Sequence, residues 1–402
     1  MAKKDIVIIG GGAAGFFSAI NIAEKNPEVR IVILEKTNQL LTKVKVSGGG
    51  RCNVTHACFN PSELVLNYPR GEKEMLGPFY NFAVDQTIFW FNEKGIDLKV
   101  EDDGRMFPTS NSSQTIIDCF LKEAKKHSIQ IHLSTEVVKI EKAEKFSVEC
   151  KGGKIYQADF VVIAIGGSAK LKHYGFVEHL GHELIEPIPS LFTFNLPKHP
   201  SNQLMGLSVN ACVQLKDTKF EECGPLLFTH WGMSGPAILK LSAKAADYLF
   251  RKSYQFEFVV TWMENTADYI LNQRSERAGT KIWQSKPEEL PKRLWEYLLT
   301  RSEINKALNW ADLNREQLQN IELVLGQDTY RANGKTTFKE EFVTCGGVKL
   351  KEINMKKMES KKVEGLYFCG EVINVDAVTG GFNFQAAWTT AFLVADSISN
   401  EV

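Results

Sequence analysis

Three glycines near the start of the chain have the spacing of a phosphate-binding turn. Gly10, Gly12 and Gly15 fit the pattern G-x-G-x-x-G, with Ala13 and Ala14 between them. In such a turn the first glycine permits the tight bend, the second lets the backbone approach a pyrophosphate, and the third lets the next helix pack closely. The N-terminus of that helix favours the phosphate charge. A bound nucleotide is predicted here, and a purely structural turn is the alternative.

A carboxylate follows at the distance that ribose binding requires. Glu35 lies 20 residues after Gly15 and directly follows the apolar run Ile31–Leu34. At this position an acidic residue accepts hydrogen bonds from a ribose with a free 2′-hydroxyl. Glu35 and the adjacent Lys36 are therefore predicted to contact the nucleotide.

A second glycine-rich run carries polar side chains. It consists of Ser47, Gly48, Gly49, Gly50, Arg51, Cys52 and Asn53. Consecutive glycines let a backbone wrap closely around a ligand and turn several amides towards it. The serine, arginine and asparagine add hydrogen bonds and a positive charge. We predict ligand contact along the whole run, and a flexible surface loop is the alternative.

A third set of residues near the end of the chain resembles the other half of a clamp. Gly370 and Glu371 follow the apolar run Leu366–Cys369, where an acidic group would bond a ribityl or ribose chain. The last predicted helix, Ala386–Ile398, is preceded by Gly380, Gly381, Phe382, Asn383 and Gln385. Its N-terminus would face a reduced, anionic flavin ring. One extended dinucleotide held by the first and last turns explains both turns, and it indicates a flavin; a helix cap alone is the alternative.

Two further motifs are candidates for the site. The apolar run Phe160–Ile165 contains Ala164 and ends in Gly166 and Gly167, which we expect to lie beside the cofactor rather than in an exposed loop. His230 lies in the run Leu227–Pro236, where it is either an acid or base near neutral pH or a structural histidine that holds a turn. In the same run, Ser234 or Gly235 is expected to cap a helix that has Pro236 at its first position.

The elements that must position these residues indicate an α/β fold with a discontinuous Rossmann-like domain. Alternating strands and helices are predicted up to about residue 185, including a helix at Thr115–Lys126. Strand-like alternation from about residue 190 suggests an antiparallel sheet or barrel, and a helical pattern follows. The predicted parts are an FAD-binding domain at 1–189 and 342–402, a β-barrel insert at 190–263 with 331–341, and a helical subdomain at 264–330.

Composition narrows the class of protein. The 402 residues are 44% hydrophobic and 24% charged, and 48 basic residues balance 48 acidic ones. A zero net charge argues against a large nucleic-acid-binding surface. The eight cysteines show no C-x-x-C pair, so we expect neither a disulfide framework nor a metal site. No run approaches the ~20 apolar residues that span a membrane. A cytoplasmic location is expected.

Together the motifs resemble a bacterial family of FAD-dependent oxidoreductases that includes aminoacetone oxidase, many of whose members are described as NAD(P)/FAD-dependent. The resemblance runs from end to end and implies non-covalent FAD, a β-barrel insert and a helical subdomain. It implies that adenosine lies near Gly10–Glu35 and the backbone of Val137, and that the flavin ring lies near Ser47–Asn53 and Gly380–Gln385. The motifs that carry it are Gly10–Gly15, Ser47–Asn53, Leu227–Pro236, Thr344–Val348 and Gly370–Gln385.

The predicted function is a flavoprotein oxidoreductase that moves hydride or electrons between a small organic substrate and NAD(P)H or O₂. Lys45, Asn53 and His230 are the predicted catalytic side chains, with Ser47 near the ring and Cys52 as a weaker redox candidate. Two alternatives from other classes remain: an FAD-dependent enzyme that modifies tRNA, and a flavin-binding protein without catalysis. The oligomeric state stays open.

Overall fold

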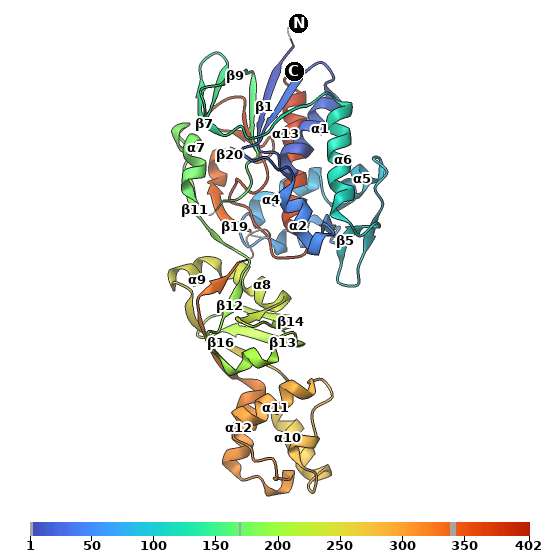
Figure 1. Cartoon of the computed structure of the whole chain (residues 1–402), viewed down its shortest axis with the longest axis vertical. Coiled ribbons are helices and arrows are strands. Elements are labelled where there is room, and N and C mark those ends of the chain that lie inside the picture. Colours follow the sequence, from blue (N-terminus) through green and yellow to red (C-terminus); the bar gives the residue numbers. More distant parts are fainter. Residues whose placement is uncertain (1–2, 169, 338–342) are drawn as a thin grey trace. The chain divides into compact units, whose positions relative to one another are not determined.

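The chain folds into two compact units. The structure, a computed structural model, describes residues 3–168, 170–337 and 343–402 (Figure 1). The first unit combines Met1–Ser190 with Phe338–Val402, and the second is the intervening segment Leu191–Thr337. The first unit is therefore built from both ends of the sequence.

A parallel sheet forms the centre of the first unit. Five strands in the order β22-β10-β1-β2-β6 are parallel, and β21 and β20 extend one edge in antiparallel pairing. The strands β1 and β10 are almost completely buried, as expected for apolar runs covered on both faces. The bounds are β1 Asp5–Ile9, β2 Arg30–Leu34, β6 Gln130–His132, β10 Phe160–Ile163, β20 Ile353–Asn354, β21 Glu359–Ser360 and β22 Leu366–Phe368.

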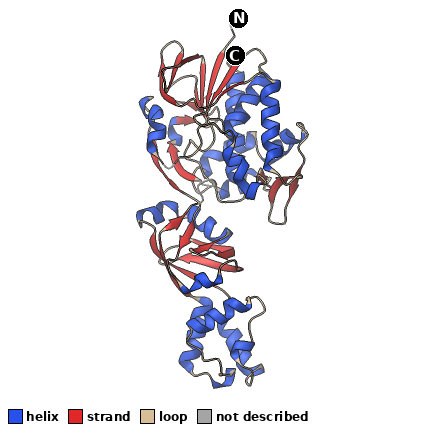
Figure 2. Ribbon diagram, viewed as in Figure 1, coloured by secondary structure: helices blue, strands red, loops and turns tan. Residues whose placement is uncertain are grey.

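Long helices gather on one side of this sheet (Figure 2). Helix α1 packs along α13, and aromatic rings such as Phe17 and Trp388, whose centroids are 5.3 Å apart, fill the contact. The predicted helix Thr115–Lys126 is confirmed as α6, which begins two residues earlier. The helices of this unit are α1 Ala13–Lys25, α2 Thr42–Gly50, α3 Pro61–Leu64, α4 Glu72–Asn81, α5 Val84–Asn92, α6 Ser113–Lys126, α7 Gly175–His179 and α13 Phe382–Ser399.

Three small sheets complete the first unit. One joins β3, β5 and β4, a second joins β7, β8 and β9, and a third pairs β11 with β19. All of these pairs are antiparallel. The bounds are β3 Thr55–His56, β4 Leu98–Val100, β5 Arg105–Pro108, β7 Val137–Lys142, β8 Phe146–Cys150, β9 Ile155–Ala158, β11 Leu184–Pro189 and β19 Thr344–Val348.

The second unit holds a seven-stranded antiparallel sheet in the order β17-β16-β13-β14-β15-β12-β18. Along β13 and β16, buried and exposed residues alternate, as the sequence pattern predicts for strands with one covered face. The bounds are β12 Thr193–Asn195, β13 Ser208–Leu215, β14 Glu221–Phe228, β15 Gly232–Ser234, β16 Gln255–Thr261, β17 Asp328–Asn333 and β18 Lys335–Thr336.

Helices and sheet of the second unit share one hydrophobic core. Buried Phe258 and Val260 of the sheet belong to the same cluster as Trp295 and Leu298 of α11. The helices are α8 Pro236–Lys244, α9 Ala246–Arg251, α10 Thr266–Glu276, α11 Lys292–Arg301 and α12 Arg315–Gly326.

One disulfide corrects the expectation that the cysteines are unpaired. Cys212 on β13 and Cys223 on β14 are bonded, directly opposite each other in the hairpin. The two cysteines are separated from the turn at Asp217 and Thr218 by the same number of residues. They face each other only in this pairing register of the two strands, which the sequence alone does not show. The other cysteines that the structure describes form no disulfide.

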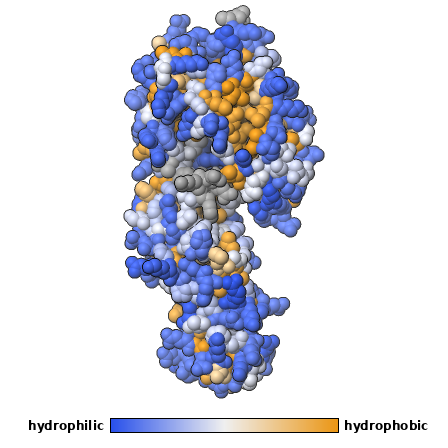
Figure 3. Space-filling model, in the orientation of Figure 1, coloured by the Kyte–Doolittle hydropathy of each residue, from blue (hydrophilic) through white to orange (hydrophobic). Residues whose placement is uncertain are grey.

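The visible surface is mostly hydrophilic, with an apolar area on the unit that contains α1 (Figure 3). Within the described ranges, every helix is too short or too polar to cross a membrane.

Candidate cofactor site

The first glycine turn lies between β1 and α1 and has the geometry that the sequence predicts. Gly10 has φ +115°, and a β-carbon there would lie 2.3 Å from the carbonyl oxygen of Ala164. A β-carbon on Gly15 would lie 2.0 Å from the oxygen of Gly10, so α1 passes close to the strand. A β-carbon on Gly12, in contrast, would meet no protein atom within 4 Å. The protein leaves space beside Gly12, where a pyrophosphate would approach.

Glu35 lies at the carboxyl end of β2, next to that turn. Its Oε2 accepts a hydrogen bond from the amide of Gly11 at 2.8 Å, and its Oε1 accepts from the amide of Thr37 at 2.8 Å. The following Lys36 is exposed. The amide of Thr135 donates to the carbonyl of Glu35, so the segment that leads into Val137 lies beside it. These contacts bring together the residues that were predicted for the adenosine half.

The first and last turns of the chain meet at the carboxyl edge of the parallel sheet. Gly370 follows β22 with φ +75°, and a β-carbon there would lie 2.8 Å from the β-carbon of Ala14. Gly167, after β10, is equally confined, because its β-carbon would lie 2.4 Å from Oε1 of Glu371. Since β22, β10 and β1 are adjacent parallel strands, their carboxyl ends share one edge.

The carboxylate of Glu371 is held by groups from distant segments. Its Oε1 accepts from the amide of Thr344 at 2.8 Å, and Lys43 of α2 pairs with its Oε2 at 2.5 Å. Its side chain is 16% exposed. Glu371 therefore joins the last turn to α2 and β19.

The run Ser47–Asn53 is a bent end of α2. Ser47 leaves the helical region with ψ 146°, and Gly48 and Gly49 have left-handed backbone angles. Beta-carbons on Gly49 and Gly50 would meet no protein atom within 4 Å, so this backbone is open to a ligand. The exposed Lys45 lies one turn earlier on α2.

The guanidinium of Arg51 already has partners inside the protein. Its Nη1 lies 2.5 Å from Oε1 of Glu101, and its guanidinium stacks 3.9 Å from the ring centroid of Phe107. Cys52 is completely buried, and burial raises the pKa of its thiol to about 12. A neutral thiol is a poor nucleophile, so this environment disfavours redox chemistry at Cys52.

Asn53 packs against the N-terminus of α13. It is 8% exposed, and a β-carbon on Gly381 would lie 2.8 Å from its Oδ1. That buried oxygen has no hydrogen-bond partner among the residues that the structure describes. A buried polar atom without a partner is unusual and indicates a missing ligand or water.

The amide side chains after Gly381 hold the turn itself. Oδ1 of Asn383 accepts from the amide of Ala377 at 2.9 Å, and its Nδ2 donates to the carbonyl of the same residue at 3.0 Å. Gln385 is fully buried and accepts from the hydroxyls of Thr55 and Thr87 at 2.6 and 3.0 Å. Asn383 therefore closes the turn that contains Gly380 and Gly381, and Gln385 ties the start of α13 to Thr55 and Thr87.

His56 is a site residue that the sequence reasoning missed. Its Nδ1 lies 3.0 Å from the carbonyl oxygen of Gly380, and its ring stacks on Phe382 at 4.5 Å between centroids. Because a carbonyl only accepts, Nδ1 carries the hydrogen in this contact. Its position three residues after Asn53 was the signal available in the sequence.

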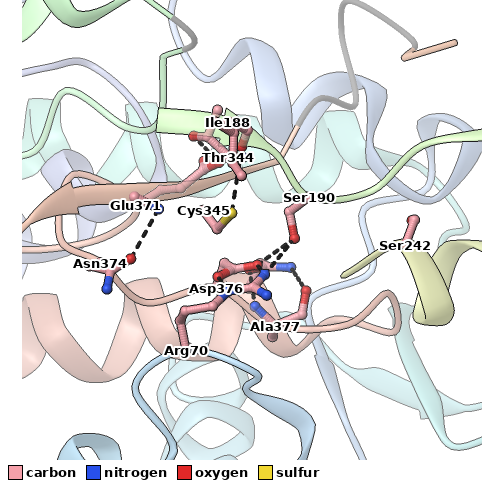
Figure 4. Close-up of polar contacts among 12 residues, drawn as sticks. Arg70, Ile188, Ser190, Ser242, Thr344, Cys345, Glu371, Asn374, Asp376 and Ala377 are labelled. Atoms are coloured by element: carbon pink, nitrogen blue, oxygen red, sulfur yellow. Dashed lines mark hydrogen bonds and ion pairs between the residues drawn. The ribbon is translucent and has the colours of Figure 1, made fainter. Parts of the chain in front are cut away.

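A buried ion pair lies near the same turn (Figure 4). Nε of Arg70 donates to Oδ1 of Asp376 at 2.6 Å, and Ser190 donates to the other oxygen of that carboxylate. The Asp376 side chain is 0% exposed. Burial raises the pKa of this carboxyl group, and the guanidinium partly offsets that effect. The two partners are far apart in the sequence, and no local pattern marks them.

The histidine motif belongs to the second unit. His230 is exposed in the turn between β14 and β15, and its ring lies 3.8 Å from that of Trp231. The predicted cap is confirmed: Gly235 precedes α8, and Pro236 is its first residue. A catalytic role for His230 stays a prediction.

These features define a class of protein: one with a Rossmann-like FAD-binding domain assembled from both ends of the chain. The chain belongs to the family described as HI0933-like protein Rossmann domain, which matches residues 4–397.

Two relatives match almost the full length of the chain. The "Ribosomal RNA dihydrouridine synthase" of Escherichia coli is 29% identical and covers 99% of this chain and 98% of its own. The "3-dehydro-bile acid delta(4,6)-reductase" of Clostridium scindens is 25% identical and covers 96% and 97%. Among solved structures, the 3-ketosteroid delta1-dehydrogenase from Sterolibacterium denitrificans shares the fold, with a TM-score of 0.55, 12% identity and both chains fully covered.

Proposed function

We propose that the protein is an FAD-dependent reductase that acts on a carbon–carbon double bond conjugated to a carbonyl group. The observation that carries this proposal is the pair of full-length relatives. Dihydrouridine is uridine whose ring double bond, conjugated to a carbonyl, is reduced. The name of the bile-acid enzyme describes reduction of double bonds in a 3-oxo steroid. Both names describe reduction of the same type of double bond, although the two substrates differ.

The shape of the first unit supports FAD as the cofactor. The backbone is open beside Gly12 and beside Gly49 and Gly50, where a ligand would approach it. The buried Oδ1 of Asn53 has no partner in the protein, as expected of an atom that meets a ligand. Cys52 is buried with a raised thiol pKa, and Nδ1 of His56 is bonded to the carbonyl of Gly380, so the proposed binding is non-covalent.

The residues around the proposed FAD site have distinct proposed roles. Glu35 would bind the ribose of the adenosine half, and the N-terminus of α13 would stabilise negative charge on the ring. Bound FAD supplies hydride transfer, and the protein supplies orientation and excludes water. Lys45 and Asn53 remain the proposed catalytic side chains of the first unit, and a catalytic role for His230 of the second unit stays a prediction. His56 holds the carbonyl of Gly380 and so would position the turn that is proposed to contact the flavin.

NAD(P)H is the proposed electron donor. A reductase needs a donor, and a nicotinamide that binds and leaves needs no second G-x-G-x-x-G in the sequence. An oxidase that uses O₂ is the alternative, as the resemblance to aminoacetone oxidase suggests.

Two substrate classes follow from the relatives. The uracil ring of RNA is favoured by the 29% identical relative. A small cyclic enone is favoured by the other relative and by the zero net charge, which argues against a large RNA-binding surface.

An anaerobic experiment tests the proposal. The purified protein is reduced with NADPH or NADH, and the flavin absorbance is followed when a cyclic enone or unmodified ribosomal RNA is added. We expect reoxidation without oxygen by one of these substrates, with the saturated product detected by mass spectrometry. Reoxidation only after air is admitted would overturn the proposal in favour of an oxidase.

A further inference from the structure

The disulfide in the second unit lies on the surface of the sheet. Cys223 is exposed and Cys212 is half-buried. The two α-carbons are 4.0 Å apart, closer than the roughly 4.4–6.8 Å that most disulfides span. Exposed disulfides on closely opposed strands are more easily reduced than buried structural ones.

The hairpin does not depend on this bond. Strands β13 and β14 form seven directly opposite pairs, from Ser208–Leu227 to Gln214–Glu221. Strand β13 also pairs with β16, and β14 also pairs with β15. Since both strands are held on both sides, the bond can open without unfolding of the sheet.

We propose that Cys212 and Cys223 form a reversible thiol–disulfide exchange site for low-molecular-weight thiols such as glutathione. This inference is independent of the flavin and of the proposed reductase activity.

The exchange runs in two balanced steps. A thiolate attacks Sγ of Cys223, the sulfur–sulfur bond breaks, and Cys212 leaves as a thiolate that takes up a proton. A second thiolate then attacks the low-molecular-weight sulfur of this mixed disulfide, and Cys223 leaves as a thiolate that takes up a proton. Two low-molecular-weight thiols are thereby oxidised to one disulfide, and the protein disulfide is reduced to two thiols.

The difference in exposure assigns the attacked sulfur. An incoming thiol reaches the exposed Cys223 more readily than Cys212. The carboxylate of Glu221 lies 4.0 Å from Sγ of Cys223 and disfavours a thiolate there once the bond is open. Glu221→Gln should therefore speed alkylation of the reduced pair.

The test uses the full-length protein in glutathione buffers of graded ratio. Thiols are trapped with iodoacetamide and located by peptide mass spectrometry, while thermal unfolding is followed in parallel. We expect the Cys212–Cys223 pair to change from bonded to alkylated as reduced glutathione rises, without loss of the folded state. A pair that stays alkylated even in oxidised glutathione, or one that opens only in denaturant, would overturn the proposal.

Single variants sharpen the test. With oxidised glutathione, Cys212→Ser should acquire one glutathione at Cys223, and Cys223→Ser should react at least fivefold more slowly. The matched control is Cys58→Ser, which changes a half-exposed free thiol in the other unit. In this variant the response of the Cys212–Cys223 bond to glutathione should be unchanged. Equal rates in the two single variants would contradict the assignment. If a single variant does not fold, the mapping of alkylated cysteines in the wild-type protein still tests whether the Cys212–Cys223 bond opens and closes reversibly.

Discussion

Gly370 and Ala14 touch, and this contact joins the last glycine turn of the chain to the first. A β-carbon on Gly370 would lie 2.8 Å from that of Ala14, and its φ of +75° is left-handed. The site therefore needs a residue without a side chain here, both for the backbone angle and for the space.

Gly370→Ala should lower the free energy of unfolding by about 2–4 kcal/mol. The left-handed angle contributes about 1–2 kcal/mol, and the overpacking against Ala14 contributes the rest. Gly153→Ala is the control, because Gly153 has a similar φ of +85° and nothing within 4 Å of its β-carbon. Urea unfolding measures both variants. Equal losses of unfolding free energy in the two variants would show that overpacking against Ala14 does not destabilise Gly370→Ala.

Arg70→Met should leave the carboxylate of Asp376 buried without its partner, at a cost of about 3–5 kcal/mol near pH 8. Burial already raises the pKa of Asp376, and without the guanidinium the native state holds its proton to higher pH. Between the unfolded and folded pKa values the native state then binds one proton more, so stability falls as pH rises.

The loss in Arg70→Met should accordingly be smaller at pH 5 than at pH 8. The double variant with Asp376→Asn should recover most of the stability at pH 8, because no charge is left to bury. Urea midpoints at both pH values provide the comparison. A loss that does not depend on pH would contradict the account of the pair.

His182 should make stability depend on pH below neutrality. It is buried between Glu352 and Ser360, and burial lowers its pKa although the carboxylate of Glu352 opposes this. The unfolded chain therefore binds the proton first, at about pH 6.5, and stability is lost as the pH falls through that value. His182→Gln should show a smaller fall in melting temperature between pH 7.5 and 5.5 than the wild type. The exposed His179→Gln should behave like the wild type, and an unchanged pH slope in His182→Gln would exclude this role.

Native alkylation should distinguish the buried Cys52 from the half-exposed Cys58. Burial raises the pKa of Cys52 to about 12, and the side chain is inaccessible. With iodoacetamide at pH 8, Cys58 should react about tenfold faster or more, since the thiolate is the reactive form. Peptide mass spectrometry gives both rates. Rapid labelling of Cys52 would restore it as a redox candidate.

Local patterns predicted the parts of the fold that depend on neighbours in sequence. The turn at Gly10–Gly15 and the cap at Gly235 are examples, because the residues that form each one lie within a few positions. The helix predicted at Thr115–Lys126 was found for the same reason, with its first residue two positions earlier.

Contacts between distant residues could not be predicted in this way. Arg70 and Asp376 carry no mark of their pairing, and the bond between Cys212 and Cys223 depends on the register of a hairpin. The placement of Asn383 beside the flavin ring stays a prediction, and the hydrogen bonds between its amide and Ala377 are a detail that the sequence did not reveal. The direction of a side chain depends on tertiary neighbours that a single sequence does not reveal.

The most direct test of the central claim is FAD binding by the wild type and by Gly12→Ala. A β-carbon on Gly12 meets no protein atom within 4 Å, so the apo form of the variant should melt within about 1 °C of the wild type. That carbon would occupy the space of the pyrophosphate, so flavin fluorescence titration should show about tenfold weaker binding or more. Gly77→Ala, which is equally open but lies on α4, should bind FAD like the wild type. We expect one FAD for each wild-type chain and a selective loss of binding in Gly12→Ala. A wild type that binds no FAD, or a Gly12→Ala variant that binds it equally well, would contradict it.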